Sequence, residues 1–203
     1  MTVYYHKYDL PECVKLNLQS IAIDTEAMGL NNIRDRLCTI QICDGSNNAH
    51  IIHFPKPDFI CNNLKAILQN KEILKIFHFA RFDVAIIQHA LNIDIENIFC
   101  TKISSRLVRT YTDAHGLRSL CDELLNIKIS KAERSSDWGA AELSREQLNY
   151  AANDVLHLHK IMKILKEKLM RENRFALAEE CFKFIPSRAK LDVLGWGEEV
   201  LNY

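Results

Sequence analysis

Three short apolar segments, separated by polar residues, dominate the first part of the chain. Residues at about 19–25, 36–43 and 48–54 are rich in Ile and other apolar side chains, and Gly, Asn or Asp lies between them. Segments of this length and composition predict β-strands. The sequence Asp-Gly-Ser-Asn-Asn from Asp44 to Asn48 is the clearest turn signal, and it predicts a hairpin between the second and third segments.

Helical and strand patterns alternate in the next part of the chain. We expect a helix at about 58–69, a strand at about 73–78, a helix at about 80–91 and a short strand near 95–99. Hairpins would therefore precede a βαβ unit. This order predicts an α/β protein whose mixed β-sheet is flanked by helices on both sides.

The C-terminal half of the chain is mostly helical in its pattern from Thr101 onward. The Ser-x-x-Gln spacing that begins at Ser144 is a capping box and predicts the start of the longest helix. The polar segment from Asn126 to Leu143 predicts a loop. Pro186 predicts the end of the last helix, before a tail that contains Gly195-Trp196-Gly197. We expect a single domain over residues 1–203.

The composition is that of a globular protein. Of the 203 residues, 48% are hydrophobic and 26% are charged, and no tract is biased. Neither a signal-peptide core nor a stretch as long as a membrane span is present, so we expect a cytoplasmic protein without a membrane partner. The 7 cysteines include no Cys-x-x-Cys pair, which favours reduced thiols over disulfides or a zinc site.

The formal net charge of the chain is zero. Strong non-specific binding to long nucleic acid grows with the number of phosphates that are neutralised, so a neutral chain argues against it. A short nucleic-acid substrate would need fewer cations. We interpret the local basic residues, taken one by one, as solvated surface; they are Arg34, Arg36, Lys102, Arg106, Arg109, Lys128, Lys131 and Arg134.

Four carboxylates and one tyrosine carry the candidate chemistry. Asp24 and Glu26 lie two residues apart in an apolar run, so on a strand both would leave the same face and repel each other unless cations hold them. Asp83 ends the sequence Phe-His-Phe-Ala-Arg-Phe-Asp. Tyr150 and Asp154 are four residues apart, which places them on one face of a helix. Together these residues predict a two-metal nuclease.

Each of these residues also has an ordinary structural interpretation. Asp24 and Glu26 would suit a turn at a strand end, Asp83 would suit a helix cap, and Tyr150 would suit an amphipathic core position. Taken singly, those interpretations would be preferred. The order of the motifs along one chain favours the catalytic interpretation.

The motifs Asp-x-Glu, Phe-Asp and Tyr-x-x-x-Asp, in this order, resemble the DEDD exonucleases of ribonuclease D type. The tyrosine marks the DEDDy branch, because the sister branch has histidine five residues before the last aspartate, where this chain has Asn149. Further segments resemble the short alphaproteobacterial members called NrnC. These are Asp24-Thr25-Glu26 through Gly29-Leu30, Arg34 to Cys38, Phe77 to Asp83, Cys100-Thr101-Lys102, Arg109 to Asp113, Ser135 to Trp138 and Ala189 to Asp192.

The resemblance covers nearly the whole chain and departs from the family at Glu198 to Tyr203. It implies a ribonuclease H-like sheet without the helical nucleic-acid-binding domains of full-length ribonuclease D. It also implies 3′-to-5′ release of nucleoside 5′-monophosphates from short single-stranded RNA, including dinucleotides. A homo-oligomer, a ring of eight subunits, is implied as well, and residues 186–203 are our candidate contact.

Two divalent metal ions, Mg²⁺ or Mn²⁺, are the expected cofactors. In this hypothesis Asp24 bridges the ions, Glu26 and Asp154 complete the first metal site, and Asp83 helps to hold the second. Tyr150 would orient the attacking water, because a free tyrosine enters in its neutral form.

The expected substrate contacts are Thr25, Leu30 and His78. Leu30 resembles an apolar wedge between two bases, and ordinary packing is an equally weighted interpretation. A histidine at the end of an apolar strand is more often a hydrogen-bonded core residue than a substrate contact. Trp138 would stack on a base or, more in keeping with its surroundings, anchor the polar loop.

Two further functions stay open at this point. One is broader 3′-end processing of tRNA or of longer RNA or DNA, as other members of the superfamily perform. The other is a non-catalytic RNA-binding protein on the same fold, since a fold alone does not establish an activity. The presence of all five chemical residues argues against the second.

Overall fold

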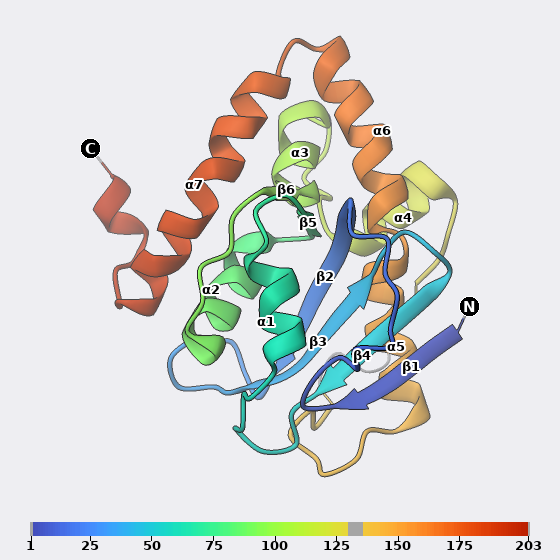
Figure 1. The fold of residues 1–203 in the computed structure, drawn as a ribbon. Helices are drawn as coiled ribbons and strands as arrows, with labels where there is room; N and C mark the ends of the chain where they lie inside the picture. Colours follow the sequence, from blue (N-terminus) through green and yellow to red (C-terminus); the bar gives the residue numbers. More distant parts are fainter. Residues whose placement is uncertain (1, 130–135, 203) are drawn as a thin grey trace.

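A mixed β-sheet forms the centre of the protein, which we describe from a computed structural model covering residues 2–129 and 136–202 (Figure 1). Within these residues the sheet has six strands in the order β1-β4-β3-β2-β5-β6. The strands are β1 (Thr2–Lys7), β2 (Ser20–Ala27), β3 (Leu37–Cys43), β4 (Asn48–His53), β5 (Leu74–Phe77) and β6 (Ile98–Cys100).

Both predicted kinds of strand connection occur in this sheet. Strands β2, β3 and β4 are antiparallel neighbours, whereas β5 pairs in parallel with β2 and with β6. All seven residues of β3 are buried, so both faces of the sheet are covered at its centre. The predicted order of hairpins followed by a βαβ unit is therefore confirmed.

Helices cover the two faces of the sheet. Figure 1 shows α1 and α2 in front of the strands and α5 behind them, while α6 and α7 form an antiparallel pair with α3 between them. From Thr101 onward the described regular structure is helical, as predicted. The helices are α1 (Asn62–Gln69), α2 (Ala80–Leu91), α3 (Thr101–Val108), α4 (Leu117–Leu125), α5 (Arg145–Leu156), α6 (Leu158–Arg171), α7 (Phe175–Val193) and the 3₁₀ helix η1 (Glu198–Leu201).

Strand β1 was not predicted from the sequence. It pairs in parallel with β4, with Thr2 opposite Asn48 and Lys7 opposite His53. A parallel partner more than forty residues away leaves no hairpin signal in the local sequence. The position of β1 at the edge of the sheet therefore depends on its long-range pairing with β4.

The prediction that Pro186 ends the last helix was wrong, because Pro186 lies inside α7. The prediction that the helix after Ser144 is the longest was also wrong, since α5 has 12 residues and α7 has 19. A proline in a helix removes one backbone hydrogen bond and is normally disfavoured. Here α7 packs along α2 and β6 and buries Phe182, Ile185 and Ala189 on both sides of the proline, so packing overrides the local preference.

The predicted loop from Asn126 to Leu143 contains no helix or strand in its described parts, 126–129 and 136–143. Residues 130–135, with Lys131 and Arg134, lie outside the described residues.

Two arginines that we interpreted as solvated make contacts within the protein instead, Arg109 as a buried residue and Arg36 as a partly buried one. Arg109 is only 1% exposed and forms a salt bridge with Glu123. Arg36 donates hydrogen bonds to the carbonyl oxygens of Phe54, Pro55 and Gly139 at 2.6, 3.0 and 3.1 Å. These contacts join the end of β4 to the segment that precedes α5. Arg36 satisfies backbone carbonyl groups, and the buried guanidinium of Arg109 is paired with a carboxylate, which overrides the usual preference of arginine for solvent.

The capping box of α5 yields a stability prediction. Gln147 donates its backbone N–H to Ser144 Oγ at 3.1 Å, and Ser144 donates its backbone N–H to Gln147 Oε1 at 2.8 Å. We expect Ser144→Ala to lower the free energy of unfolding by about 1 kcal/mol, which for a chain of this size is a fall of roughly 2–4 °C in the melting temperature. Calorimetry would check this. A matched Ser46→Ala change in the exposed turn after β3 should have a smaller effect.

Candidate active site

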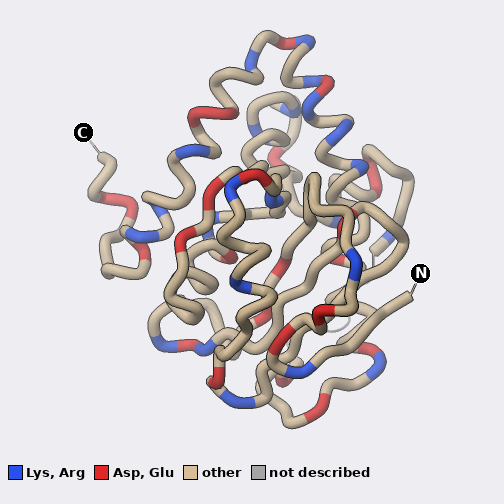
Figure 2. The backbone as a smooth tube through the Cα atoms, in the orientation of Figure 1, with Lys and Arg blue, Asp and Glu red and all other residues tan. Residues whose placement is uncertain are grey.

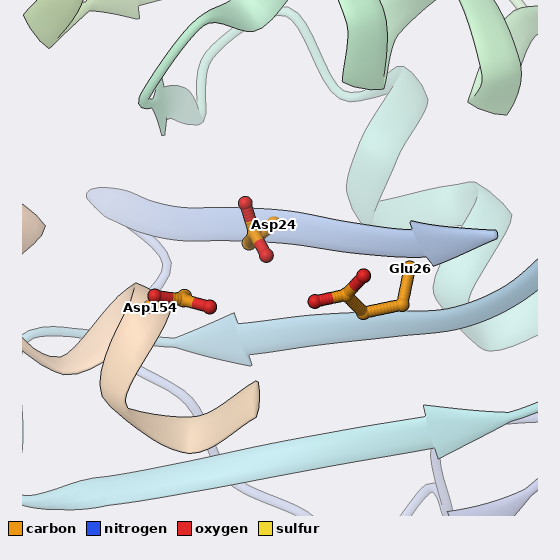
Figure 3. A group of neighbouring side chains, drawn as sticks. All are labelled: Asp24, Glu26 and Asp154. Atoms are coloured by element: carbon orange, nitrogen blue, oxygen red, sulfur yellow. The ribbon is translucent and has the colours of Figure 1, made fainter. Parts of the chain in front are cut away.

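Three carboxylates meet between β2 and α5 (Figure 3). One oxygen from each of Asp24, Glu26 and Asp154 lies within 4.8 Å of the other two. The first two residues come from alternate positions of β2, and the third comes from the middle of α5. All three side chains are half-buried. The same-face prediction for Asp24 and Glu26 therefore describes their placement, and α5 brings the third carboxylate to them.

Asp83 stands beside this group in the first turn of α2. Its side chain is buried, and Thr25 donates its hydroxyl to Asp83 Oδ1 at 2.7 Å. Thr25 lies between the two acidic residues of β2 and is itself buried, with 6% of its surface exposed. In this structure the Thr25 hydroxyl orients Asp83, and its expected contact with substrate remains a prediction.

The carboxylates raise one another's pKa. Burial holds the pKa of Asp24 well above its usual range, and the charges of Asp83, Asp154 and Glu26 add to the effect. Burial is also the largest cause that raises the pKa of Asp83 and of Asp154. In the described part of the chain, none of these three aspartates forms an ion pair with Lys or Arg. Within the described residues, negative charge is thus gathered at these aspartates without a Lys or Arg ion pair to balance them.

This donor set fits hard divalent cations. Carboxylate oxygens are the ligands that Mg²⁺ and Mn²⁺ prefer, and neither thiol nor imidazole belongs to the cluster of Asp24, Glu26 and Asp154. A cation bound at this cluster would supply positive charge and favour the ionised form of the carboxylates. Three of the four carboxylates surround one position, and the charge of Asp83 acts on Asp24 from beside it.

Tyr150 lies one helical turn before Asp154 on α5. Its ring packs against the ring of Trp138, with the ring centroids 6.1 Å apart and tilted by 44°. Trp138 is buried, with 2% of its surface exposed, so it supports the tyrosine and the loop and does not offer a face to a base. Packing on Trp138 restricts the rotation of the phenol and directs it to one side of the helix.

His78 is a neutral hydrogen-bonding residue at the end of β5. Thr101 donates its hydroxyl to the carbonyl oxygen of Phe77 at 3.1 Å, so its oxygen is left to accept from His78 Nδ1 at 2.9 Å. Burial, with a smaller contribution from Lys102, lowers the pKa of His78 to about 3. The imidazole therefore presents Nε2 as an acceptor, which suits a hydroxyl group and not a phosphate.

Leu30 is 88% exposed in the loop that follows β2. Packing inside the chain, which we weighed equally with a wedge role, does not occur. Leu30 instead lines a groove of about 470 Å³, and Phe79 and Trp196 line the same groove. Aromatic and apolar side chains in an open groove, beside polar ones such as Asn31 and Arg81, are suited to unstacked bases.

An ion-pair network that the sequence analysis missed fastens the C-terminal tail to α2. Arg81 donates to both carboxylate oxygens of Asp192 at 2.7 and 2.8 Å, and it also contacts Glu198 at 2.7 Å. Arg188 donates to the same Asp192 at 2.8 Å. Since Arg81 lies two residues before Asp83, the tail and the carboxylate cluster share one helix turn. Residues 111 positions apart offer no spacing signal for such a pair.

Comparison with known proteins gives the family. A family profile described as 3′-5′ exonuclease matches residues 11–170. The chain belongs to the 3′-5′ exonucleases. Brucella melitensis NrnC with bound Mg²⁺ has a TM-score of 0.91 and 47% identity to this exonuclease, over 97% of this chain and 96% of that chain. NrnC from the same organism bound to pGG has a TM-score of 0.93 and 48% identity, over 97% and 95% of the two chains.

Ribonuclease D from Gluconacetobacter diazotrophicus is 32% identical to this exonuclease over 154 residues, which are 76% of this chain and 39% of that protein. The exonuclease therefore lies in the ribonuclease D superfamily, beside NrnC, and its sheet with flanking helices is the ribonuclease H-like fold that the sequence predicted. It spans between 39% and 41% of the length of the first three curated relatives. Among the described residues, no helix combines the length and apolar character that a membrane span requires.

The raised carboxylate pKa values yield a prediction for the metal-free exonuclease. The folded chain keeps protons on Asp24, Asp83 and Asp154 at pH values where the unfolded chain, with its carboxyl pKa near 4, has released them. Stability should therefore fall as the pH rises from about 5 to about 8. Mn²⁺ should raise the melting temperature more at the higher pH, because it binds the ionised carboxylates.

The matched control is Asp24→Asn, which removes one titrating group at nearly constant volume. Melting scans in EDTA should show a smaller loss of stability with pH for this variant than for the natural protein. Identical pH profiles for the two proteins, with the same response to Mn²⁺, would contradict the assignment of the cluster as a cation site.

Proposed function

We propose that the chain is a two-metal 3′-to-5′ exoribonuclease that hydrolyses short RNA, including dinucleotides, to nucleoside 5′-monophosphates. The observation that carries this proposal is the meeting of Asp24, Glu26 and Asp154 within 4.8 Å, beside Asp83 and one turn from Tyr150. A structural role for a strand turn or a helix cap would not require these carboxylates to converge. Convergence of several carboxylates on one point is the expected arrangement for holding divalent metal ions.

Asp24, Glu26 and Asp154 would hold one ion, and Asp24 with Asp83 would hold the second. When bound, two divalent cations activate a water molecule and stabilise charge on the leaving oxygen of a phosphodiester. The remaining work falls to the protein. Thr25 keeps Asp83 in one orientation, and the capping box fixes the start of the helix that carries Asp154.

Tyr150 would orient the attacking water through its hydroxyl. Its position one turn before Asp154 places the phenol on the same helix face as the carboxylate. Trp138 holds the ring by packing, so the hydroxyl needs little reorganisation during the reaction. This is the role that the tyrosine of the DEDDy pattern suggests.

The charge distribution supports a short substrate. The formal net charge is zero, and Figure 2 shows basic and acidic residues interspersed along the backbone, without an extended basic track. Affinity would then come from the metals at the scissile phosphate and from the exposed groove beside Leu30. Binding of pGG by Brucella melitensis NrnC agrees with this size of ligand. His78 would accept a hydrogen bond from a sugar hydroxyl, and Thr25 would contact substrate through its backbone.

We also propose that the chain assembles with copies of itself, as the family resemblance implies. The end of α7 and the tail leave Leu194 72% exposed and Trp196 55% exposed, with Val200 and Leu201 also at the surface. A run of apolar side chains at the surface is typical of a protein contact. The candidate contact, residues 186–203, therefore includes the end of α7 as well as the tail that follows it.

Substrate length is the first test of this function. Cleavage of 5′-labelled RNA from two to about twenty nucleotides, with Mn²⁺ or Mg²⁺ and beside matched DNA, should give the highest kcat/KM for dinucleotides, because longer strands add few contacts. A folded Asp24→Asn protein should lose nearly all activity on every length.

A steady rise of kcat/KM with length would indicate an extended binding track and favour 3′-end processing of longer RNA. Binding without cleavage by the natural, metal-supplied protein would favour the non-catalytic alternative.

The second test removes the phenol of Tyr150. Tyr150→Phe keeps the packing on Trp138 and loses only the hydroxyl, so the single-turnover rate should fall by at least about 10²-fold while substrate affinity stays close to that of the natural protein. Tyr4→Phe, on the edge strand β1, is a control that removes a distant hydroxyl. Weaker binding with a normal single-turnover rate would make Tyr150 a substrate clamp.

The third test addresses assembly. Leu194→Glu and Val200→Glu place charge on the exposed apolar tail and should lower the mass measured by light scattering, because a charge is costly to bury at an interface. Ile60→Glu is the matched control, since Ile60 is 74% exposed but lies before α1. A natural protein that is monomeric at working concentrations would refute the proposed assembly.

A further inference from the structure

Two polar side chains are buried on β3, beside the carboxylates of β2. In the antiparallel pairing of these strands Gln41 lies opposite Asp24, and Thr39 lies opposite Glu26. Side chains that lie opposite each other in such a pair leave the same face of the sheet, with Cβ atoms about 5 Å apart. Gln41 and Thr39 are both 0% exposed. Polar groups inside the sheet therefore flank the carboxylate cluster.

The carboxamide of Gln41 extends along β3 toward Thr39. Gln41 donates from Nε2 to Thr39 Oγ1 at 2.7 Å. Since Thr39 lies two residues earlier on the same strand, the amide lies between the two positions of β3 that face Asp24 and Glu26. The amide is thus a neighbour of both carboxylates of β2, although Gln41 is not one of the candidate metal ligands.

The amide of Gln41 is only partly satisfied. Its Oε1 atom is buried and has no hydrogen-bond partner in the described structure. A buried carbonyl oxygen without a donor is costly, and an apolar side chain of similar size would avoid that cost. The alternate positions of β3 do carry apolar side chains, Ile40 and Ile42, which are buried in the core. Packing alone therefore does not account for a glutamine at this position.

The opposite orientation of the same amide satisfies more of its groups. A threonine hydroxyl both accepts and donates, so after half a turn of the amide Thr39 would donate to Oε1. The NH₂ group of Gln41 would then take the place of the unpartnered oxygen, and the residue across the ladder is an acceptor, Asp24. An N–H donated to a carboxylate forms a charge-assisted hydrogen bond, and such bonds hold carboxylate ligands of metal ions in one orientation.

We propose that Gln41 is a positioning residue of the metal site, whose amide N–H donates to a carboxylate oxygen of Asp24 or Glu26. Thr39 holds the carbonyl oxygen of the same amide. This inference rests on the proposed metal-dependent function and adds to it two residues of β3 that touch neither metal nor substrate. Their role is to keep the carboxylates of β2 in the orientation that the cations need.

Calorimetric titration of the intact protein with Mn²⁺ tests this role without hydrolysis. Gln41→Met keeps the length of the side chain and removes the amide, so the dissociation constant for Mn²⁺ should rise by about tenfold or more, the usual effect of losing such a supporting hydrogen bond. Thr39→Val removes the hydroxyl that holds the amide and should also weaken Mn²⁺ binding. Thr39→Ser keeps a hydroxyl and should restore an affinity close to that of the natural protein.

The stability of the metal-free protein separates positioning from packing. The double variant Thr39→Val/Gln41→Met replaces both partners with apolar groups of similar shape, a change that is nearly neutral or stabilising for a buried pair. Its melting temperature in EDTA should therefore equal or exceed that of the natural protein, although its affinity for Mn²⁺ is lower. Gln88→Met is the matched control, because Gln88 is a buried glutamine of α2 whose amide atoms also lack partners in the described structure. This variant should bind Mn²⁺ as the natural protein does.

Single-turnover cleavage of a dinucleotide adds a third measurement. Raising the Mn²⁺ concentration should restore the rate of Gln41→Met, whereas Asp24→Asn should stay inactive. Natural affinity for Mn²⁺ in both Gln41→Met and Thr39→Val would overturn the positioning role, as would an equal loss of affinity in Gln88→Met or a destabilised double variant in EDTA.

These negative results would leave the metal-dependent function in place, because the natural protein would still bind Mn²⁺ and cleave RNA. Failure of the natural protein to bind Mn²⁺ would instead reject the metal site itself, and this inference with it.

Discussion

Mutual repulsion among buried carboxylates is the constraint on which the rest of the structure depends. Burial is the largest cause that raises the pKa of Asp24, Asp83 and Asp154, and the charges of neighbouring carboxylates add to it at Asp24 and Asp83. Such a group would spread apart on a mobile scaffold. The protein places it on β2, a strand paired on both sides, and on α5, a helix with a complete capping box. Rigid regular structure keeps like charges together until cations bind.

The N-terminal turn of α2 connects the carboxylate cluster to the groove that contains Leu30. Asp83 points inward to Thr25. Phe79 and Arg81 instead line the groove that contains Leu30 and the neighbouring cavity between α3 and α7. Arg81 also holds Asp192, so a bidentate ion pair ties the end of α7 to this turn. A change at the tail would reach the carboxylates through one ion pair and a single turn of helix. This arrangement explains why a residue far along the chain lies beside the site.

Basic residues are used locally in this neutral protein. Arg36 donates to backbone carbonyl groups, Arg109 is paired with Glu123, and Arg81 is paired with the tail. Lys102 and Arg106 form no ion pair in the described structure, and both line the cavity between α3 and α7. This distribution offers a long polyanion few further cations along one path.

The sequence by itself determined the type of site and most of the elements. The spacing of Asp24 and Glu26 and that of Tyr150 and Asp154 gave their shared faces, since these depend only on strand and helix periods. Tertiary structure alone decided that α5 brings Asp154 to β2, that β1 pairs with β4, and that α7 continues through Pro186. Those outcomes depend on contacts between residues far apart in the chain, which compete with local preference and leave no periodic signal in the sequence.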